Sequence, residues 1–189
     1  DELLGVVADV NRKLAQSEPR KLLTPGPLTT RHSVKHAMLT DHCTWDEEYK
    51  AITTSVMNDI TDISANADYA TVLLQGSGTY AVEAMINCLC GKDEKILFLV
   101  NGEYGKRMLT IAEDFGREYD FLTFDMTRPI DIKMVEKELQ KGKDITSVVF
   151  VHCETTTGII NPLEDITRLA KFHGKKVLVD AMSSFAAYE

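Results

Sequence analysis

The sequence predicts an α/β fold in which helices flank a mostly parallel sheet. Short apolar runs, many of them β-branched, recur at residues 70–74, 96–100, 119–124, 147–151 and 177–179. Segments with helical spacing of apolar residues separate them, at residues 79–90, 104–115, 131–140 and 162–173. Strands that alternate with helices in this way build parallel sheets covered on both faces. The 189 residues, 44% of them hydrophobic, are enough for the core of one such domain or most of it.

The first 21 residues are predicted to be a leader helix, a linker or the tail of a preceding domain. Their apolar residues begin with helical spacing, but the stretch 16–19 is polar and ends in proline. The segment Thr24-Pro25-Gly26-Pro27 follows, and it cannot be helical because two prolines flank a glycine. We expect a stiff loop in which Pro25 and Gly26 edge a substrate pocket.

Two helices are predicted before residue 70. Ser33 is suited to cap a short helix that ends at Met38, and Trp45 precedes the acidic first turn of a longer one. His32 and His36 lie four residues apart on the shorter helix, a spacing that also suits a metal ion. No third ligand accompanies them, so we expect an ordinary helix surface and no metal site.

The helix predicted at residues 162–173 has boundary signals at both ends. Asn161 is suited to cap it, and Pro162 fits the first helical position because no hydrogen bond needs the missing N–H there. Gly174 is suited to end the helix.

Charge and composition argue against several classes of protein. A formal net charge of -8 without a basic run disfavours nucleic acid as a partner. No apolar stretch approaches the roughly 20 residues of a membrane span, and residues 1–20 lack the features of a signal peptide. The four cysteines contain no C-x-x-C pair and no zinc-like spacing, which suits reduced thiols. We expect a cytoplasmic protein that acts on small molecules.

A glycine-rich turn, Gln75-Gly76-Ser77-Gly78-Thr79, connects a predicted strand to a predicted helix. Free N–H groups, two hydroxyls and the positive end of the helix dipole meet there, a combination that binds phosphate. The glycines also fit a tight turn without function, or the G-x-G-x-x-A variant of a dinucleotide-binding turn. The dinucleotide interpretation needs an acidic residue at the end of the next strand, and Glu103 fits that position poorly.

Three more loops follow predicted strands, where ligands of open α/β sheets bind. Glycines near Tyr104 leave its ring free to lie against a planar ligand, and an aromatic residue packed on the sheet is the alternative. Thr155 begins a run of three threonines that offers hydroxyls or simply forms a turn. Asp180 ends an apolar strand, where a carboxylate needs a cation, several donors or a role as a helix cap.

Five motifs, taken in order, carry a family resemblance: T-P-G-P, Q-G-S-G-T-Y-A-V-E-A, N-G-E-Y-G-K-R, H-C-E-T-T-T-G and V-D-A-M-S-S-F. From about Leu22 to Glu189 the chain resembles the 2-aminoethylphosphonate:pyruvate transaminases. These are class V aminotransferases of fold type I, related to alanine-glyoxylate and serine-pyruvate aminotransferases. The resemblance implies a homodimer with pyridoxal 5'-phosphate as cofactor. It also implies transfer of the amino group of 2-aminoethylphosphonate to pyruvate, giving phosphonoacetaldehyde and L-alanine.

The same resemblance gives the candidate residues their roles. Ser77, Gly78 and Thr79 would hold the cofactor phosphate. Tyr104 would stack on the pyridine ring, and Thr155 would hydrogen-bond near the phenolic oxygen of that ring. Asp180 would pair with the protonated ring nitrogen, so it is the catalytic candidate of this chain.

The lysine that forms the Schiff base in this family is expected well beyond the strand-end aspartate. The chain ends at Glu189, nine residues after Asp180, and Lys175 and Lys176 precede the strand. Residues 22–189 are therefore expected to be the N-terminal part of the cofactor-binding large domain, truncated before the Schiff-base lysine and the C-terminal small domain. We expect this stretch alone to be inactive.

Two other functions stay open at this point. An alanine- or serine-dependent aminotransferase that uses glyoxylate or pyruvate is one, because such relatives share the cofactor motifs. A dinucleotide-binding oxidoreductase domain is the more remote alternative.

Overall fold

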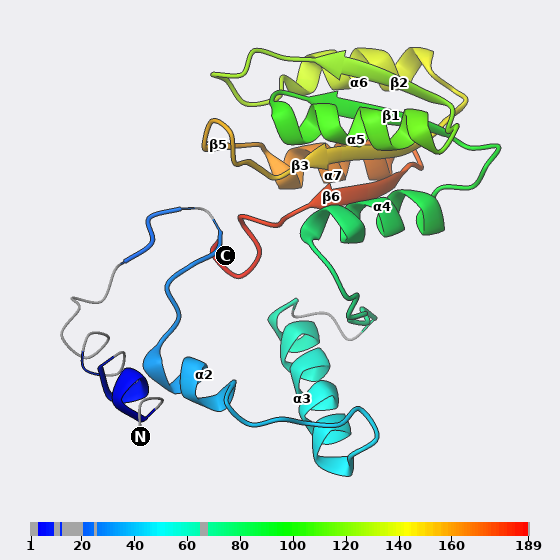
Figure 1. The fold of residues 1–189 in the computed structure, drawn as a ribbon. Coiled ribbons are helices and arrows are strands. Elements are labelled where there is room, and N and C mark those ends of the chain that lie inside the picture. Colours follow the sequence, from blue (N-terminus) through cyan, green and yellow to red (C-terminus); the bar gives the residue numbers. More distant parts are fainter. Residues whose placement is uncertain (1–3, 10–11, 13–20, 25, 65–67, 189) are drawn as a thin grey trace. The chain divides into compact units, whose positions relative to one another are not determined.

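The computed structural model describes residues 4–9, 12, 21–24, 26–64 and 68–188 (Figure 1). The chain divides into two compact units, Asp1–Cys43 and Thr44–Glu189. In the first unit, residues 4–9 are helical, and α2 spans His32–Ala37. Pro25, predicted at a substrate pocket, lies outside the described residues, whereas Gly26 is described and exposed.

The prediction that Ser33 caps α2 is wrong. The residue at the cap position is Arg31, and no side chain makes a capping hydrogen bond there. Because the helix already begins at His32, Ser33 lies inside the first turn and not before it. The longer helix is confirmed as α3 (Glu47–Ile63), with Asp46 at the cap position and two glutamates in the first turn.

The predicted parallel sheet is confirmed in the second unit. It contains β1 (Lys95–Val100), β2 (Tyr119–Thr123), β3 (Ile145–Val151) and β6 (Lys176–Asp180) in the order β2-β1-β3-β6. Every neighbouring pair is parallel. A short antiparallel pair, β4 (Cys153–Glu154) and β5 (Ile159–Ile160), projects from the segment after β3.

The strand predicted at residues 70–74 does not form. These residues have no regular secondary structure, and Val72, Leu73 and Leu74 are 47–77% exposed. An extended apolar run becomes a strand only when a neighbouring strand satisfies its N–H and C=O groups. No strand among the described residues pairs with this segment.

Helices cover both faces of the sheet, two on each (Figure 1). On one face, α4 (Gly78–Leu89) and α5 (Glu103–Asp114) pack on Ile96, Phe98 and Val100 of β1. On the other, α6 (Ile132–Lys141) and α7 (Leu163–Phe172) pack around Leu97 and Leu99 of the same strand. Alternate residues of a strand point to opposite faces, so a continuous apolar run is buried on both sides.

The prediction that Asn161 caps α7 is also wrong. The helix begins at Leu163 with Pro162 at the cap position, and no side chain caps it. Asn161 is 1% exposed and turns inward. Its side chain exchanges two hydrogen bonds with that of Asn101, of 2.9 and 3.1 Å, because both buried amides need partners. The predicted end of α7 is confirmed, with Gly174 in the left-handed region at φ +70°.

The order of the strands creates a topological switch point between β1 and β3. The chain leaves β1 through α5 on one face to reach β2, and returns through α6 on the other face to reach β3. Loops that leave neighbouring strands in opposite directions open a crevice at the carboxyl edge of the sheet, where such folds bind their ligands. The loops after β1, β3 and β6 all start at this edge.

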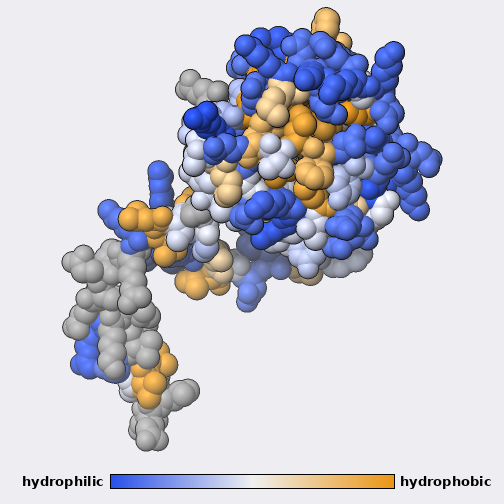
Figure 2. Space-filling view, turned by 90° about the horizontal axis from the view of Figure 1, so that it is seen from above, coloured by the Kyte–Doolittle hydropathy of each residue, from blue (hydrophilic) through white to orange (hydrophobic). Residues whose placement is uncertain are grey.

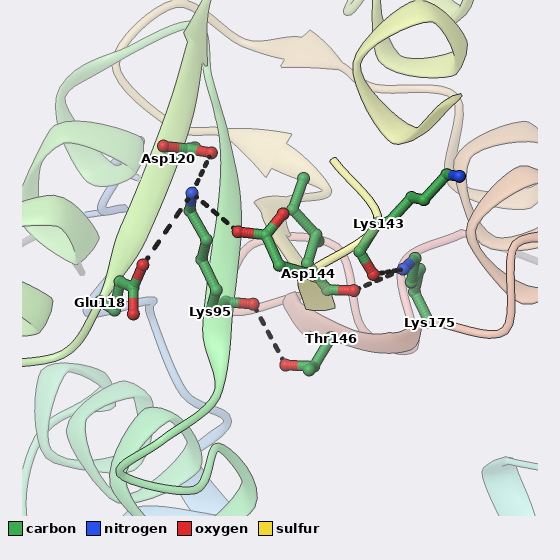
Figure 3. A network of polar contacts seen from close by, with 8 residues as sticks. Lys95, Glu118, Asp120, Lys143, Asp144, Thr146 and Lys175 are labelled. Carbon is green, nitrogen blue, oxygen red and sulfur yellow. Dashed lines mark hydrogen bonds and ion pairs between the residues drawn. The ribbon is translucent and has the colours of Figure 1, made fainter. Parts of the chain in front are cut away.

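A charged network ties the opposite, amino-terminal edge together (Figure 3). The ammonium group of Lys95 lies 2.9 Å from a carboxylate oxygen of Asp120 and 3.1 Å from one of Asp144. Lys175 donates to the backbone oxygen of Ile145 at 2.5 Å. These contacts join the starts of β1, β2, β3 and β6, far from the carboxyl edge.

The face seen in Figure 2 has an apolar area among charged side chains. Among the exposed apolar residues is Phe121, 53% exposed on the edge strand β2. None of the helices in the described part of the chain is both long and apolar enough to cross a membrane.

Candidate functional site

The glycine-rich turn leads directly into α4. Ser77 is the residue at the cap position, with extended backbone, and its side chain makes no capping hydrogen bond. The first N–H groups of α4 therefore keep the orientation in which a helix end binds an anion. Gly76, at φ +129°, adopts a conformation that other residues rarely accept.

Gly78 brings the start of α4 against the segment after β6. A Cβ atom at this position would lie 1.8 Å from the terminal methyl carbon of Met182, so a side chain here would have to displace the end of that methionine. The predicted phosphate turn and the predicted ring-nitrogen partner thus belong to adjoining segments.

Arg107, on the second turn of α5, reaches the same turn and was not singled out from the sequence. Its Nη1 donates to the hydroxyl of Thr79 at 3.3 Å. Its guanidinium carbon also lies 5.1 Å from the ring centroid of Tyr104, within the range of a cation–π contact. The sequence signal was the spacing, because residues three apart on a helix share a face.

Tyr104 is the second residue of α5, and its side chain is 38% exposed. A ring largely packed on the sheet was the alternative prediction, and partial exposure beside Arg107 favours a ring available to a ligand. The adjacent Gly105 is buried, and a Cβ there would lie 3.1–3.5 Å from atoms of Val100. This glycine lets α5 start close to the end of β1.

Thr155 follows β4 and lies beside the segment after β6. Its hydroxyl is 2.6 Å from the hydroxyl of Ser183. Ser183 was not identified from the sequence except as one letter of a motif. The contact joins the loop after β3 to the loop after β6, which holds Thr155 near the carboxyl edge.

Asp180 is the last residue of β6 and is half-buried. Its Oδ1 accepts a hydrogen bond of 3.0 Å from the N–H of Met182, so the carboxylate stabilises the turn that follows. The alternative prediction of a helix cap is wrong, because the described residues after β6 form turns and no helix. The second oxygen, Oδ2, has no hydrogen-bond partner in the described part of the chain. A carboxylate oxygen without a partner, on a half-buried residue, is suited to a cationic ligand.

The structure therefore gathers the Ser77–Thr79 turn, Tyr104, Thr155 and Asp180 at one edge of one sheet. Direct contacts connect them in a series, from Gly78 to Met182, from Thr79 to Arg107 and from Thr155 to Ser183. Gly26 belongs to the other unit, so its place at a pocket stays a prediction.

Lys175 and Lys176 lie at the opposite end of β6 from Asp180. Four residue steps along a strand separate Lys176 from Asp180, or about 13 Å. Lys176 is engaged there with Glu94, at 2.8 Å. Neither lysine is placed to react beside Asp180.

Among the described residues, no group of three or more His, Cys, Asp or Glu side chains is arranged to hold a metal ion. His32 and His36 lie exposed on α2.

The fold first defines a class: a parallel α/β domain whose candidate ligand site lies at the carboxyl edge of its sheet. The family model Aminotransferase class-V matches residues 36–188, so the chain belongs to the class V aminotransferases.

Relatives and solved structures agree with this membership. A 2-aminoethylphosphonate--pyruvate transaminase of Bacteroides fragilis (strain YCH46) is 50% identical over 171 residues, 89% of this chain and 47% of that protein. One of the same name from Bacillus mycoides (strain KBAB4) is 48% identical over 170 residues, 89% of this chain and 47% of that protein. The chain thus spans about half the length of these relatives.

The crystal structure of pyridoxamine-pyruvate aminotransferase from Mesorhizobium loti superposes with a TM-score of 0.83 at 26% identity, over 92% of this chain and 44% of that one. The alanine--glyoxylate aminotransferase of Nostoc sp. shares the fold, with a TM-score of 0.80 at 24% identity over 93% of this chain and 48% of that one.

The family implies pyridoxal 5'-phosphate as cofactor, and the residues present fit it. The uncapped start of α4, the hydroxyl of Thr79 and the guanidinium of Arg107 suit a phosphate dianion. The free oxygen of Asp180 suits a protonated ring nitrogen. The dinucleotide interpretation is not favoured, because residues 68–74, which lead into the glycine-rich turn, form no strand.

Proposed function

We propose that the intact protein moves the amino group of 2-aminoethylphosphonate to pyruvate and yields phosphonoacetaldehyde and L-alanine. The observation that carries the proposal is the convergence of the phosphate turn, Tyr104 and Asp180 at one sheet edge. The choice of substrates is supported by the names of relatives at 47–50% identity.

Pyridoxal 5'-phosphate, when bound, supplies an electron sink that eases removal of a proton from the carbon next to an amino group. The residues of this chain supply binding, orientation and charge. Ser77, Gly78 and Thr79 hold the phosphate through N–H and hydroxyl groups, with Arg107 as a nearby cation. Asp180 keeps a proton on the ring nitrogen, since a carboxylate favours the protonated form of a base beside it.

Two contacts orient the ring. Tyr104 offers one face for stacking, and Arg107 restrains the tyrosine ring. Thr155 would hydrogen-bond near the phenolic oxygen of the cofactor, and its 2.6 Å contact with Ser183 restrains its hydroxyl. The ring is then held at its phosphate, its nitrogen and its plane.

The proposal also covers the intact protein, including the parts that lie outside this chain. We take residues 22–189 as the N-terminal part of the large domain, and place the Schiff-base lysine and the small domain in the remaining length that the relatives have. The protein is proposed to be a cytoplasmic homodimer, and its free cysteines suit a reducing compartment.

Absorption spectroscopy of the intact protein tests the function. The protein with pyridoxal phosphate is scanned before and after 2-aminoethylphosphonate is added without pyruvate, and released phosphonoacetaldehyde is quantified. We expect the visible band to disappear with one aldehyde released for each cofactor. A band that persists with this donor but responds to alanine or serine contradicts the substrate assignment. Absence of any band contradicts the cofactor assignment.

A further inference from the structure

One buried carboxylate connects the Tyr104 loop to the Thr155 loop. Glu154, the last residue of β4, is fully buried at 0% exposure. Its two oxygens accept hydrogen bonds from the N–H groups of Tyr104 at 3.4 Å, Gly105 at 3.3 Å and Thr156 at 3.3 Å. The hydroxyl of Thr156 donates to it as well.

These partners are donors without charge. No lysine, arginine or histidine forms an ion pair with Glu154 in the part of the chain that the structure describes. A desolvated carboxylate then depends on N–H and O–H donors and on the positive end of α5, whose first turn contains Tyr104 and Gly105. The same hydrogen bonds therefore satisfy the Glu154 carboxylate and hold the first turn of α5 in place.

Gly102 makes room for this carboxylate. A Cβ atom at residue 102 would lie 2.2 Å from both Cγ and Cδ of Glu154. The backbone of Gly102 is extended, at φ -176°, so its conformation is open to any residue and only the space requires glycine. The loop after β1 is thus shaped around Glu154.

We propose that Glu154 is a positioning residue that sets the place of Tyr104 and of Thr155 at the cofactor, without touching cofactor or substrate itself. The inference rests on the proposed function. Glu154 acts on Tyr104 through the N–H groups at the start of α5 and on Thr155 through the chain, as its direct neighbour. Both loops, after β1 and after β3, lie at the switch point, so the Glu154 side chain fixes their positions relative to each other.

The first test is Glu154→Gln in the intact protein. Glutamine keeps the shape, but its NH₂ group faces N–H donors and leaves them unsatisfied. We expect the affinity of the apoenzyme for pyridoxal phosphate to fall about tenfold, because the start of α5 shifts and Tyr104 is no longer held in the orientation that binds the ring. The matched control is Glu136→Gln on the exposed side of α6, which should leave the affinity unchanged.

A double-mutant cycle separates positioning from general damage. Because Glu154 acts through both Tyr104 and Thr155, Glu154→Gln should weaken affinity clearly less in a Tyr104→Ala background than in the parent protein, the remainder being the part that acts through Thr155. An equal loss in both backgrounds, or no loss in the parent protein, overturns the proposal.

Gly102→Ala provides a second route that keeps the carboxylate. Its added methyl group displaces Glu154, so we expect the same loss of affinity in the parent protein. In a Tyr104→Ala background the loss should again be smaller. Normal affinity in this variant also overturns the proposal. If Glu154→Gln does not fold, Gly102→Ala alone tests whether Glu154 positions the two loops.

Hydrogen exchange of the apoprotein distinguishes failure of this inference from failure of the proposed function. Amides at residues 104 and 105 should exchange faster in Glu154→Gln than in the parent or in Glu136→Gln. If the parent binds no pyridoxal phosphate, the proposed function fails, and faster exchange still supports Glu154 as the residue that fixes this turn. Unchanged exchange at residues 104 and 105 overturns the positioning role of Glu154.

Discussion

The two oxygens of the Asp180 carboxylate have different surroundings. One oxygen accepts the N–H of Met182, which fixes the carboxylate, and the other is left for a ligand. The structure shows the contact with the turn, and the pairing with a ring nitrogen stays a prediction.

Asp180→Asn in the intact protein should retain the cofactor but lose turnover by orders of magnitude. The amide keeps the size of the side chain, yet it removes the negative charge that keeps the ring nitrogen protonated. Steady-state kinetics and a cofactor titration on the same preparation measure the two effects. Near-normal turnover would remove Asp180 from the mechanism.

Arg107 is expected to contribute to affinity for the phosphate group. Arg107→Met should weaken binding of pyridoxal phosphate about tenfold while binding of pyridoxal, which lacks the phosphate, stays nearly unchanged. Arg107→Lys keeps the charge and should lose less. Parallel fluorescence titrations with both ligands measure this difference, and an equal loss for both would assign Arg107 to packing of the Tyr104 ring alone.

At the scale of elements, the amide pair of Asn101 and Asn161 joins the end of β1 to the segment before α7. Asn161 also donates to the backbone oxygen of Val151 at 2.8 Å and accepts from the N–H of Ile130 at 3.1 Å. Four segments of the carboxyl edge thus share one buried polar group.

Asn161→Ala should lower the free energy of unfolding by about 2–3 kcal/mol, because it leaves buried donors and acceptors without partners. Urea denaturation of the intact protein measures the change. Asn58→Ala, on an exposed position of α3, is the control and should stay within about 0.5 kcal/mol. A similar value for both variants would mean that water replaces the lost contacts.

The amino-terminal edge is expected to weaken in acid. The hydrogen bond from Lys95 lowers the pKa of the Asp144 carboxyl, and hydrogen bonds from Lys95 to Asp120 and Asp144 raise the pKa of the ammonium group. A carboxyl whose pKa is lowered on folding stabilises the protein above its unfolded pKa of about 4 and loses that effect as the pH falls below it.

Asp144→Asn should therefore lower the melting temperature at pH 7, and the gap from the parent protein should narrow as the pH is brought below about 4. Thermal melts across that range provide the measurement. A gap that is the same at every pH would show that the contact acts through packing and not through charge.

At the scale of the whole molecule, the proposed homodimer has a direct test. Light scattering on the intact protein should give a mass twice that of one chain, because the family resemblance implies a homodimer and two-fold dimers are the commonest assemblies of soluble proteins. A monomer that retains full transaminase activity would contradict the proposal.

Local patterns predicted most of the fold correctly. The strands at 96–100, 119–124, 147–151 and 177–179 and the four helices between residues 79 and 173 form within one or two residues of their predicted bounds. The helices have apolar residues at helical spacing and the strands are short apolar runs, so local chemistry was sufficient. The failures at residues 70–74 and at Asn161 depend on partners distant in the sequence, a missing neighbouring strand among the described residues in one case and the Asn101 side chain in the other. The error at Ser33 is local, because α2 begins one residue earlier than predicted.

The sequence by itself determined the α/β class, the membership of a family that five ordered motifs revealed, and the residue types suited to a phosphate, a ring and a ring nitrogen. Only the tertiary structure decided which of these residues meet. The roles of Arg107, Ser183 and Glu154 depend on contacts across 28 to 50 residues. Spacing along a chain specifies local periodicity, whereas the burial of a carboxylate depends on what the fold places around it.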